Sequence, residues 1–180
     1  MSAADALDTI WQSYIDTIDC LKVASRCIST GRIEHLDKTG FIQTSKPEAE
    51  KKISASRKNA DEFLILSLWA VFERSLFFHL QKESDRILQS AQTKLTLGIH
   101  EKIKDEIEYW RVDDVLDLFK THIDPNLIGN AKQVKKYRDW VAHRNPNKLP
   151  TTNVPPHMAY KVLSEIASQL SEGESGSNAE

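Results

Sequence analysis

The segment VKKYRDWVAHRNP, residues 134–146, combines side chains that could act together on a phosphate group. Arg138, Asp139 and His143 fall on the last turns of an expected helix, which Pro146 terminates. A histidine titrates near neutral pH and can move a proton, and a nearby aspartate can hold one of its ring nitrogens. A guanidinium matches two phosphate oxygens at once. An acid–base group beside such a charge clamp predicts phosphodiester cleavage.

Helical geometry distributes these residues around the helix axis. With about 100° per residue from Val134, Arg138 lies near the edge of the apolar face, whereas Asp139 and His143 lie together on the polar side. Because residues four apart are neighbours on a helix, Asp139 is expected to orient the imidazole of His143. The side chains expected to attract and bind the phosphate backbone of the substrate are Lys132, Lys135, Lys136 and Asn145.

An arginine and a histidine at this spacing are not specific by themselves. RSLFFH, residues 74–79, repeats the spacing in the most apolar part of the chain, with no acidic residue four positions before the histidine. We interpret Arg74 and His79 as structural, with Arg74 as one candidate partner of Glu73. The same reading is open for Arg138 and His143, because a lysine-flanked helix face is commonly only solvated. The adjacent aspartate and the exposed helix end favour a functional pair.

The hydrophobic pattern predicts an all-α bundle of five to six helices with a long, central second helix. In that helix the stretch FLILSLWAVFERSLFFHL is apolar nearly all round, which predicts the most buried element. Residues 31–45 are expected to form a loop, residues 1–170 the bundle, and residues 171–180 a disordered acidic tail. The expected helices cover residues 3–30, 47–90, 99–110, 112–122, a fifth from Pro125 through the opening segment, and 157–170.

Composition suits one soluble domain and limits the classes of function. The chain has 180 residues, 40% of them hydrophobic, and a net charge of −2, so nucleic-acid binding must depend on a local patch. Cys20 and Cys27, two helical turns apart, are too distant for a disulfide, which favours reduced thiols and a cytoplasmic location. We expect no signal peptide, membrane span, metal or cofactor, because no such segment, ligand spacing or Gly-rich phosphate loop is found.

The pattern Arg-[polar]-x3-His, late in a small helical bundle, resembles the HEPN domain family (higher eukaryotes and prokaryotes nucleotide-binding). SLWAVFERSLFFHL is also similar to the Trp/Phe-Glu region of bacterial HEPN toxins. The resemblance implies a HEPN-like fold, with Arg138 and His143 as the catalytic pair and Asp139 as the polar residue after the arginine. It further implies a metal-independent endoribonuclease that cleaves RNA in a homodimer cleft and leaves a cyclic phosphate.

The same resemblance implies a biological setting and leaves a second function open. Family members commonly act as toxins or phage-defence effectors, often beside a nucleotidyltransferase-type antitoxin. Glu73, a carboxylate on an apolar helix, is expected to need a partner, either Arg74 or Arg138, and could support the site. The alternative function is a non-catalytic HEPN-like module that binds a partner protein or a nucleotide, because membership of a fold does not establish activity.

Overall fold

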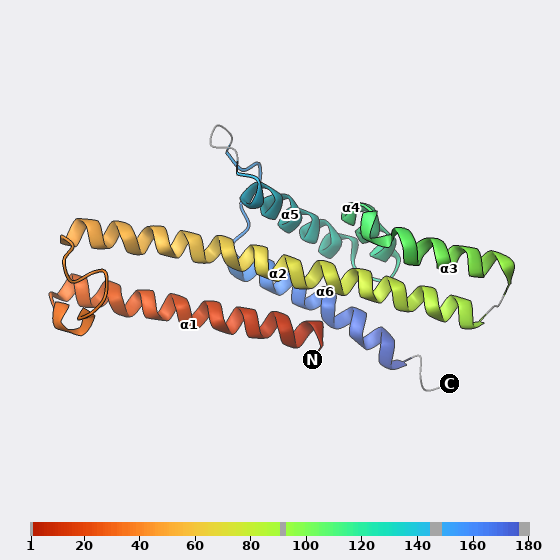
Figure 1. Cartoon of the computed structure of the whole chain (residues 1–180), viewed down its shortest axis with the longest axis horizontal. Helices are drawn as coiled ribbons and strands as arrows, with labels where there is room; N and C mark the ends of the chain where they lie inside the picture. Colours follow the sequence, from red (N-terminus) through yellow and green to blue (C-terminus); the bar gives the residue numbers. More distant parts are fainter. Residues whose placement is uncertain (1, 91–92, 145–148, 177–180) are drawn as a thin grey trace.

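The protein is an all-α bundle, as predicted (Figure 1). The computed structural model describes residues 2–90, 93–144 and 149–176, and no strand occurs in these ranges. Short 3-10 turns follow or join several helices: η1 (Ile33–Leu36), η2 (Ile107–Tyr109) and η3 (Phe119–Thr121). The α-helices of the described chain are α1 (Ala3–Thr30), α2 (Lys46–Ser90), α3 (Lys94–Glu106), α4 (Val112–Leu118), α5 (Pro125–Ala142) and α6 (Pro156–Gly176).

α1 and α2 form a long antiparallel hairpin, and local capping sets its ends (Figure 1). The Ser2 hydroxyl accepts the Asp5 N–H at 3.1 Å, and the Asp5 carboxylate accepts the Ser2 N–H at 2.8 Å. α1 stops at Gly31, whose φ of +72° suits a residue without a Cβ. At the start of α2, the Glu48 carboxylate accepts the backbone N–H of Ser45 at 3.1 Å. The predicted start and stop of the first helix are confirmed.

The connected end of this hairpin has its own small core. The 3-10 turn η1 lies within the predicted loop, and its Leu36 packs between α1 and α2. The side chains buried there are Ala24, Ile28, Leu36, Ala49 and Ile53. Cys20 and Cys27 are free thiols, as their spacing predicted. This end therefore depends on a few aliphatic contacts and lies apart from the main core.

The centre of α2 is the main element of the core, but only on part of its surface. Leu68, Trp69 and Phe72 have no exposed surface, whereas Phe63 is 64% exposed and Phe78 is 57% exposed. The sequence predicted this stretch, apolar nearly all round, as the most buried element, and one of its faces is nonetheless exposed. The physical reason is the arrangement of its neighbours, since α1, α5 and α6 pack against the other sides.

The same stretch makes α2 the one described helix that could cross a membrane by length and composition alone. A core helix of a globular bundle has a similar composition, because its apolar side chains face other helices. Leu68, Trp69 and Phe72 of this stretch belong to the main core, together with side chains from α1, α4, α5 and α6.

α6 closes the bundle beside α1 and α2 (Figure 1). The spacing of Met158, Val162, Ile166 and Leu170 predicts one core-facing stripe; the last three are buried, but Met158 is 40% exposed and does not join the core. Met158 lies about 100° around the helix from its neighbour Ala159, which is fully buried, and so falls at the edge of the packed face. α6 continues to Gly176, into the segment predicted as a disordered tail. Residues 177–180 lie outside the described part of the chain.

α3 differs most from expectation. It begins at Lys94, not Ile99, because Thr93 and Thr96 form a reciprocal cap that hydrophobic periodicity does not reveal. It ends at Glu106, before the 3-10 turn η2. None of its residues is buried, although it packs along the end of α2. This helix therefore extends along α2 at the periphery of the bundle.

Candidate functional site

The candidate site lies on the second half of α5, which is fixed at both ends. Asp124 caps its start by accepting the Asn126 N–H at 2.9 Å, and Pro125 occupies the first turn, as predicted. The helix ends at Ala142. His143 is the C-cap, and its N–H donates to the Asp139 carbonyl at 3.0 Å. The buried face of the helix consists of Leu127, Ile128, Ala131 and Val134.

Arg138 is held against α2. Its Nη2 donates to Oε2 of Glu73 at 3.0 Å, and its Nη1 donates to Oδ1 of Asp139 at 3.0 Å. The guanidinium carbon lies 5.8 Å from the ring centre of Trp69, which is fully buried. The side chain is a quarter exposed. Two carboxylates and an aromatic ring therefore fix the direction of the guanidinium, as a phosphate clamp requires.

These contacts answer the question that the sequence left open about Glu73. Its partner is Arg138, across the helix interface, and not its neighbour Arg74. Arg74 is exposed, and within the described residues its side chain makes no ion pair or hydrogen bond. The candidate pairing of Arg74 with Glu73 is therefore wrong. The residues lie on different faces of α2, because adjacent helical positions diverge by about 100°.

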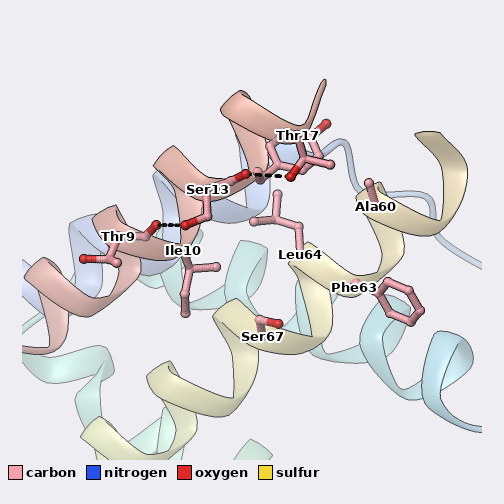
Figure 2. A pocket seen from close by; sticks show the side chains of 9 residues that line it. Thr9, Ile10, Ser13, Thr17, Ala60, Phe63, Leu64 and Ser67 are labelled. Carbon is pink, nitrogen blue, oxygen red and sulfur yellow. Dashed lines mark hydrogen bonds between the residues drawn. The ribbon is translucent and has the colours of Figure 1, made fainter. Parts of the chain in front are cut away.

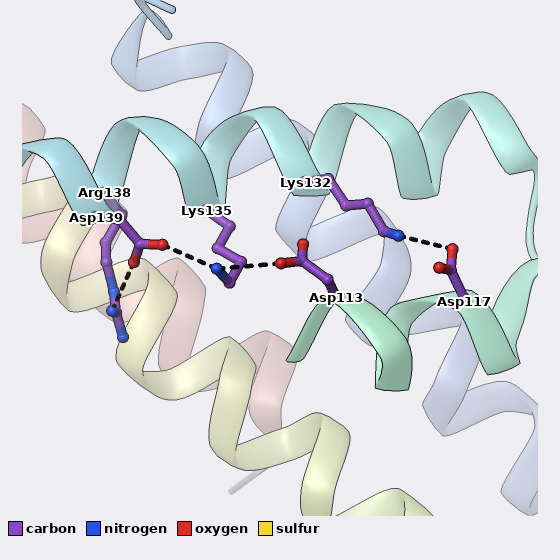
Figure 3. Close-up of polar contacts among 6 residues, drawn as sticks. All are labelled: Asp113, Asp117, Lys132, Lys135, Arg138 and Asp139. Carbon is purple, nitrogen blue, oxygen red and sulfur yellow. Dashed lines mark hydrogen bonds and ion pairs between the residues drawn. The ribbon is translucent and has the colours of Figure 1, made fainter. Parts of the chain in front are cut away.

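The carboxylate of Asp139 is bound to cations and not to the imidazole (Figure 3). Its Oδ2 accepts from Lys135 at 2.8 Å, and its Oδ1 accepts from Arg138. His143 is exposed, and in the described ranges its ring makes no hydrogen bond or ion pair. The expected Asp139–His143 hydrogen bond is thus absent there. Lys135 and Arg138 each occupy one oxygen of the Asp139 carboxylate, while His143, as the C-cap, has non-helical φ and ψ of −115° and +29°.

Carboxylates of α4 neutralise the lysines that were expected to bind substrate (Figure 3). Lys132 pairs with Asp117 at 2.7 Å, and Lys135 pairs with Asp113 at 3.3 Å as well as with Asp139. Lys120 also pairs with Asp117, at 2.6 Å. The flank of α5 is consequently a band of alternating charges, which attracts phosphate less strongly than the lysines alone would.

These pairs change the proton affinity of their members. Hydrogen bonds from Lys120 and Lys132 hold the pKa of Asp117 below its ordinary value. Burial lowers the pKa of Lys135, but its hydrogen bond to Asp139 and the charges of Asp139 and Asp113 outweigh burial and raise that pKa. Both shifts favour the charged forms, so the band persists across the neutral pH range.

The two remaining predicted substrate-binding residues stand apart from this band. Lys136 is exposed on the outer side of α5. Asn145 lies outside the described residues. Of the predicted positions, the fold brings together Arg138, Asp139 and Glu73. Lys132 and Lys135 lie on the same flank, where each forms a salt bridge to α4. His143 lies beyond the last turn of α5.

A second ion pair, missed by sequence reasoning, ties the segment after His143 to α2. Arg144 donates to Glu62, a buried carboxylate on α2, and its guanidinium lies 5.3 Å from the ring centre of Trp140. Glu62 and Glu73 are eleven positions apart, which is close to three helical turns, so they share one face of α2. That spacing of two carboxylates on an apolar helix was the available signal.

The second Arg-x4-His pair does not converge on a contact between its members. His79 is largely shielded, and its ring centre lies 5.7 Å from that of Phe119, whereas Arg74 is exposed. A cleft of about 420 Å³ opens beside Arg74 and the candidate site. It is lined by Ala70, Glu73, Arg74, Phe77, Trp110 and Val112.

Another hollow, of about 390 Å³, lies between α1 and α2 near Phe63 (Figure 2). Several of its hydroxyl groups already have protein partners: Ser13 donates to the Thr9 carbonyl at 2.9 Å, Thr17 donates to the Ser13 carbonyl at 2.8 Å, and Tyr14 donates to Asp61 on α2 at 2.7 Å. These donors are therefore satisfied without a ligand, and no charged side chain lines the hollow. It offers no group for phosphate chemistry.

No group of three or more His, Cys, Asp or Glu side chains suited to a metal ion occurs among the described residues. The site therefore consists of the Arg138 clamp, the α4–α5 charge band, the exposed His143 and the neighbouring cleft. No protein-family model matches the chain, and neither a curated protein nor a solved structure is significantly similar to it.

Proposed function

We propose that this protein is a metal-independent endoribonuclease of the HEPN type, acting as a cytoplasmic toxin or phage-defence effector. The observation that supports this most directly is the fixed guanidinium of Arg138 on the helix that ends with an exposed His143. Preorganised charge of this kind stabilises the negative charge that develops on phosphorus oxygens, at no cost of reorganisation. The proposed reaction needs no metal or cofactor, because the two side chains supply both charge and proton transfer.

In the proposed reaction, a ribose 2′-oxygen attacks the adjacent phosphorus and the bond to the 5′-oxygen breaks. The products are a 2′,3′-cyclic phosphate and a 5′-hydroxyl. His143 accepts the proton of the 2′-hydroxyl and passes it to the leaving 5′-oxygen, while Arg138 stabilises the charge on the phosphoryl oxygens. Arg138 faces α2 and His143 lies beyond the end of α5, so we further propose a homodimer in which two copies complete one cleft.

The test is cleavage of single-stranded RNA in the presence of EDTA by wild type, Arg138→Ala and His143→Ala. We expect each substitution to reduce the rate at least about a hundredfold. Arg86→Ala and His157→Ala are matched controls on α2 and α6, and they should keep the wild-type rate. The cleaved 3′ ends should resist ligation until the cyclic phosphate is removed. Equal rates in all five proteins would exclude the proposed chemistry.

One observation favours a second candidate, a non-catalytic module that binds a partner protein. Lys132, Lys135 and Arg138 are already paired with carboxylates, which leaves less positive charge for RNA. A partner protein with its own alternating charges suits such a band, and the family resemblance suggests a nucleotidyltransferase-type antitoxin as the candidate. RNA that stays intact with wild type, together with a stable complex with the partner protein that Lys132→Glu disrupts, would support this candidate and exclude the nuclease.

A further inference from the structure

The cleft beside Arg74 adjoins the clamp around Arg138. Glu73 belongs to both, because it lines the cleft and its carboxylate accepts from Arg138 at 3.0 Å. One wall is α2, with Ala70 and Phe77, and the other is the connection from α3 to α4, with Trp110. A group bound in the cleft would therefore lie next to a phosphate held by Arg138.

The size and lining of the cleft suit a flat aromatic ring. Its volume of about 420 Å³ falls within the range of small-molecule sites. Trp110 and Phe77 are half-buried and pack against the main core, so their rings have fixed positions yet keep exposed surface. Nucleobases stack on such rings regardless of sequence. Ala70 leaves room because its side chain is a single methyl group.

The charges at the cleft complement a nucleotide on two sides. Arg74 is exposed and makes no ion pair or hydrogen bond within the described residues, so its guanidinium is available to a phosphate. Glu73 offers carboxylate oxygen to the N–H groups of a base edge. The opposing charges thus match the two ends of a nucleotide, phosphate at Arg74 and base toward Glu73 and Trp110.

We propose that this cleft is a subsite for one nucleobase of single-stranded RNA, next to the phosphate bound at Arg138, an inference that rests on the proposed function. Trp110 stacks on the base, Phe77 completes the apolar wall, and Arg74 binds the following phosphate. The subsite explains how a chain with net charge −2 holds RNA, because stacking supplies affinity that the neutralised lysines do not.

The test is equilibrium binding of a fluorescein-labelled RNA hexanucleotide to the full chain carrying His143→Ala, followed by fluorescence anisotropy. In this background Trp110→Leu should weaken binding about tenfold, and Trp110→Phe, which keeps a stacking face, should restore most of it. Arg74→Ala should weaken binding about fivefold and reduce the magnitude of the salt slope by about 0.7.

The controls are Trp11→Leu, which removes a ring stacked on Tyr160, and Arg86→Ala, which removes an arginine paired with Glu83. Both should bind RNA as the parent does. Thermal unfolding of each variant, followed by circular dichroism, establishes that the protein tested is folded.

The outcomes separate this inference from the proposed nuclease. Binding that depends on Trp110 and Arg74, with no cleavage by wild type, would support the subsite and exclude the nuclease. Cleavage by wild type with unchanged binding by both variants would overturn the subsite alone. A shift from dimer to monomer on Trp110→Leu with unchanged RNA affinity would also overturn it, because a second copy would then occupy the cleft.

Discussion

Arg138 carries its charge in a position where only a quarter of the side chain meets water. A partly buried guanidinium is stable only when its N–H groups have acceptors. Glu73 and Asp139 accept from separate nitrogens of this forked group. A bound phosphate must therefore compete with two carboxylates for the guanidinium of Arg138. The remaining donors of the fork are the ones available to a ligand.

Arg138→Lys tests whether the fork or merely the charge matters. A lysine has a single nitrogen, so it cannot serve both carboxylates in a plane or grip a phosphate with two prongs. We expect RNA cleavage to fall at least about tenfold and the free energy of unfolding to fall by about 1 kcal/mol. Initial cleavage rates and urea unfolding measure the two effects. Arg86→Lys is the control, and equal behaviour of the two variants would contradict the role of the fork.

Asp117 makes the charge band dependent on pH. Its pKa is lower in the folded chain than its ordinary value of 3.8. A carboxyl with a depressed pKa stabilises the fold above the unfolded pKa, and this contribution is lost as the pH falls through the folded pKa. The melting temperature of wild type should therefore exceed that of Asp117→Asn at pH 7, and the difference should disappear as the pH falls through the folded pKa of Asp117, which lies below 3.8.

A pH series of melting curves measures this difference. In a Lys132→Met background the effect of Asp117→Asn should be smaller, because one of the two cations that depress the pKa is gone. A difference between wild type and Asp117→Asn that stays constant from neutral to acidic pH would contradict the assignment.

At the scale of the element, α2 acts as the support for α5. Glu62 and Glu73 lie on one face of α2 and bind Arg144 and Arg138. The last turn of α5 and the residue after His143 are thus tied to one rigid helix. The position of the site therefore also depends on the stability of α5, which a substitution at Gly129 can test.

Gly129→Ala should stabilise α5. No atom lies within 4 Å of the position of an added Cβ, and alanine favours helix over glycine by about 0.5–1 kcal/mol. Gly31→Ala has equal space but a φ of +72°, so it should destabilise the fold by about 1 kcal/mol. Urea unfolding of both variants measures the two changes. Shifts of the same sign would contradict the assigned backbone conformations.

At the scale of the whole molecule, the hairpin end and the main core have unequal stability. The small core around Ile28 and Ile53 lies at the connected end of α1 and α2, whereas Leu68 is fully buried among α1, α2, α4, α5 and α6. Regions with few buried apolar contacts open locally, at lower free energy than the whole chain. The loop end should therefore open without disturbing the site.

Ile53→Ala and Leu68→Ala should consequently destabilise different parts of the chain. Both remove buried methyl groups and cost about 2–5 kcal/mol where the surroundings cannot collapse. We expect Ile53→Ala to speed amide exchange only near residues 22–53, and Leu68→Ala to speed it throughout the bundle, including α5. Hydrogen exchange followed by mass spectrometry measures this. Equal loss of protection at α5 in both variants would show that the two cores unfold together.

Much of the fold follows from local sequence signals. The ends of α1 and the start of α5 were predicted at the observed residues, because Gly31, Asp124 and Pro125 act on their own backbone neighbourhood. The start of α3 was missed, since threonine pairs that cap a helix leave no mark in the hydrophobic pattern. Helical periodicity also identified the apolar helix but could not show which of its faces stays uncovered.

The chain by itself determined that Arg138, Asp139 and His143 lie on one helix end, since these positions depend only on helical geometry. Only the tertiary structure decided their partners. Glu73 and Asp113 are distant in sequence but pair with Arg138 and Lys135 in space, and Asp139 binds these two cations and not the imidazole of His143. Coulomb energy depends on distance through space, so a basic helix in the sequence became a neutralised band in the fold.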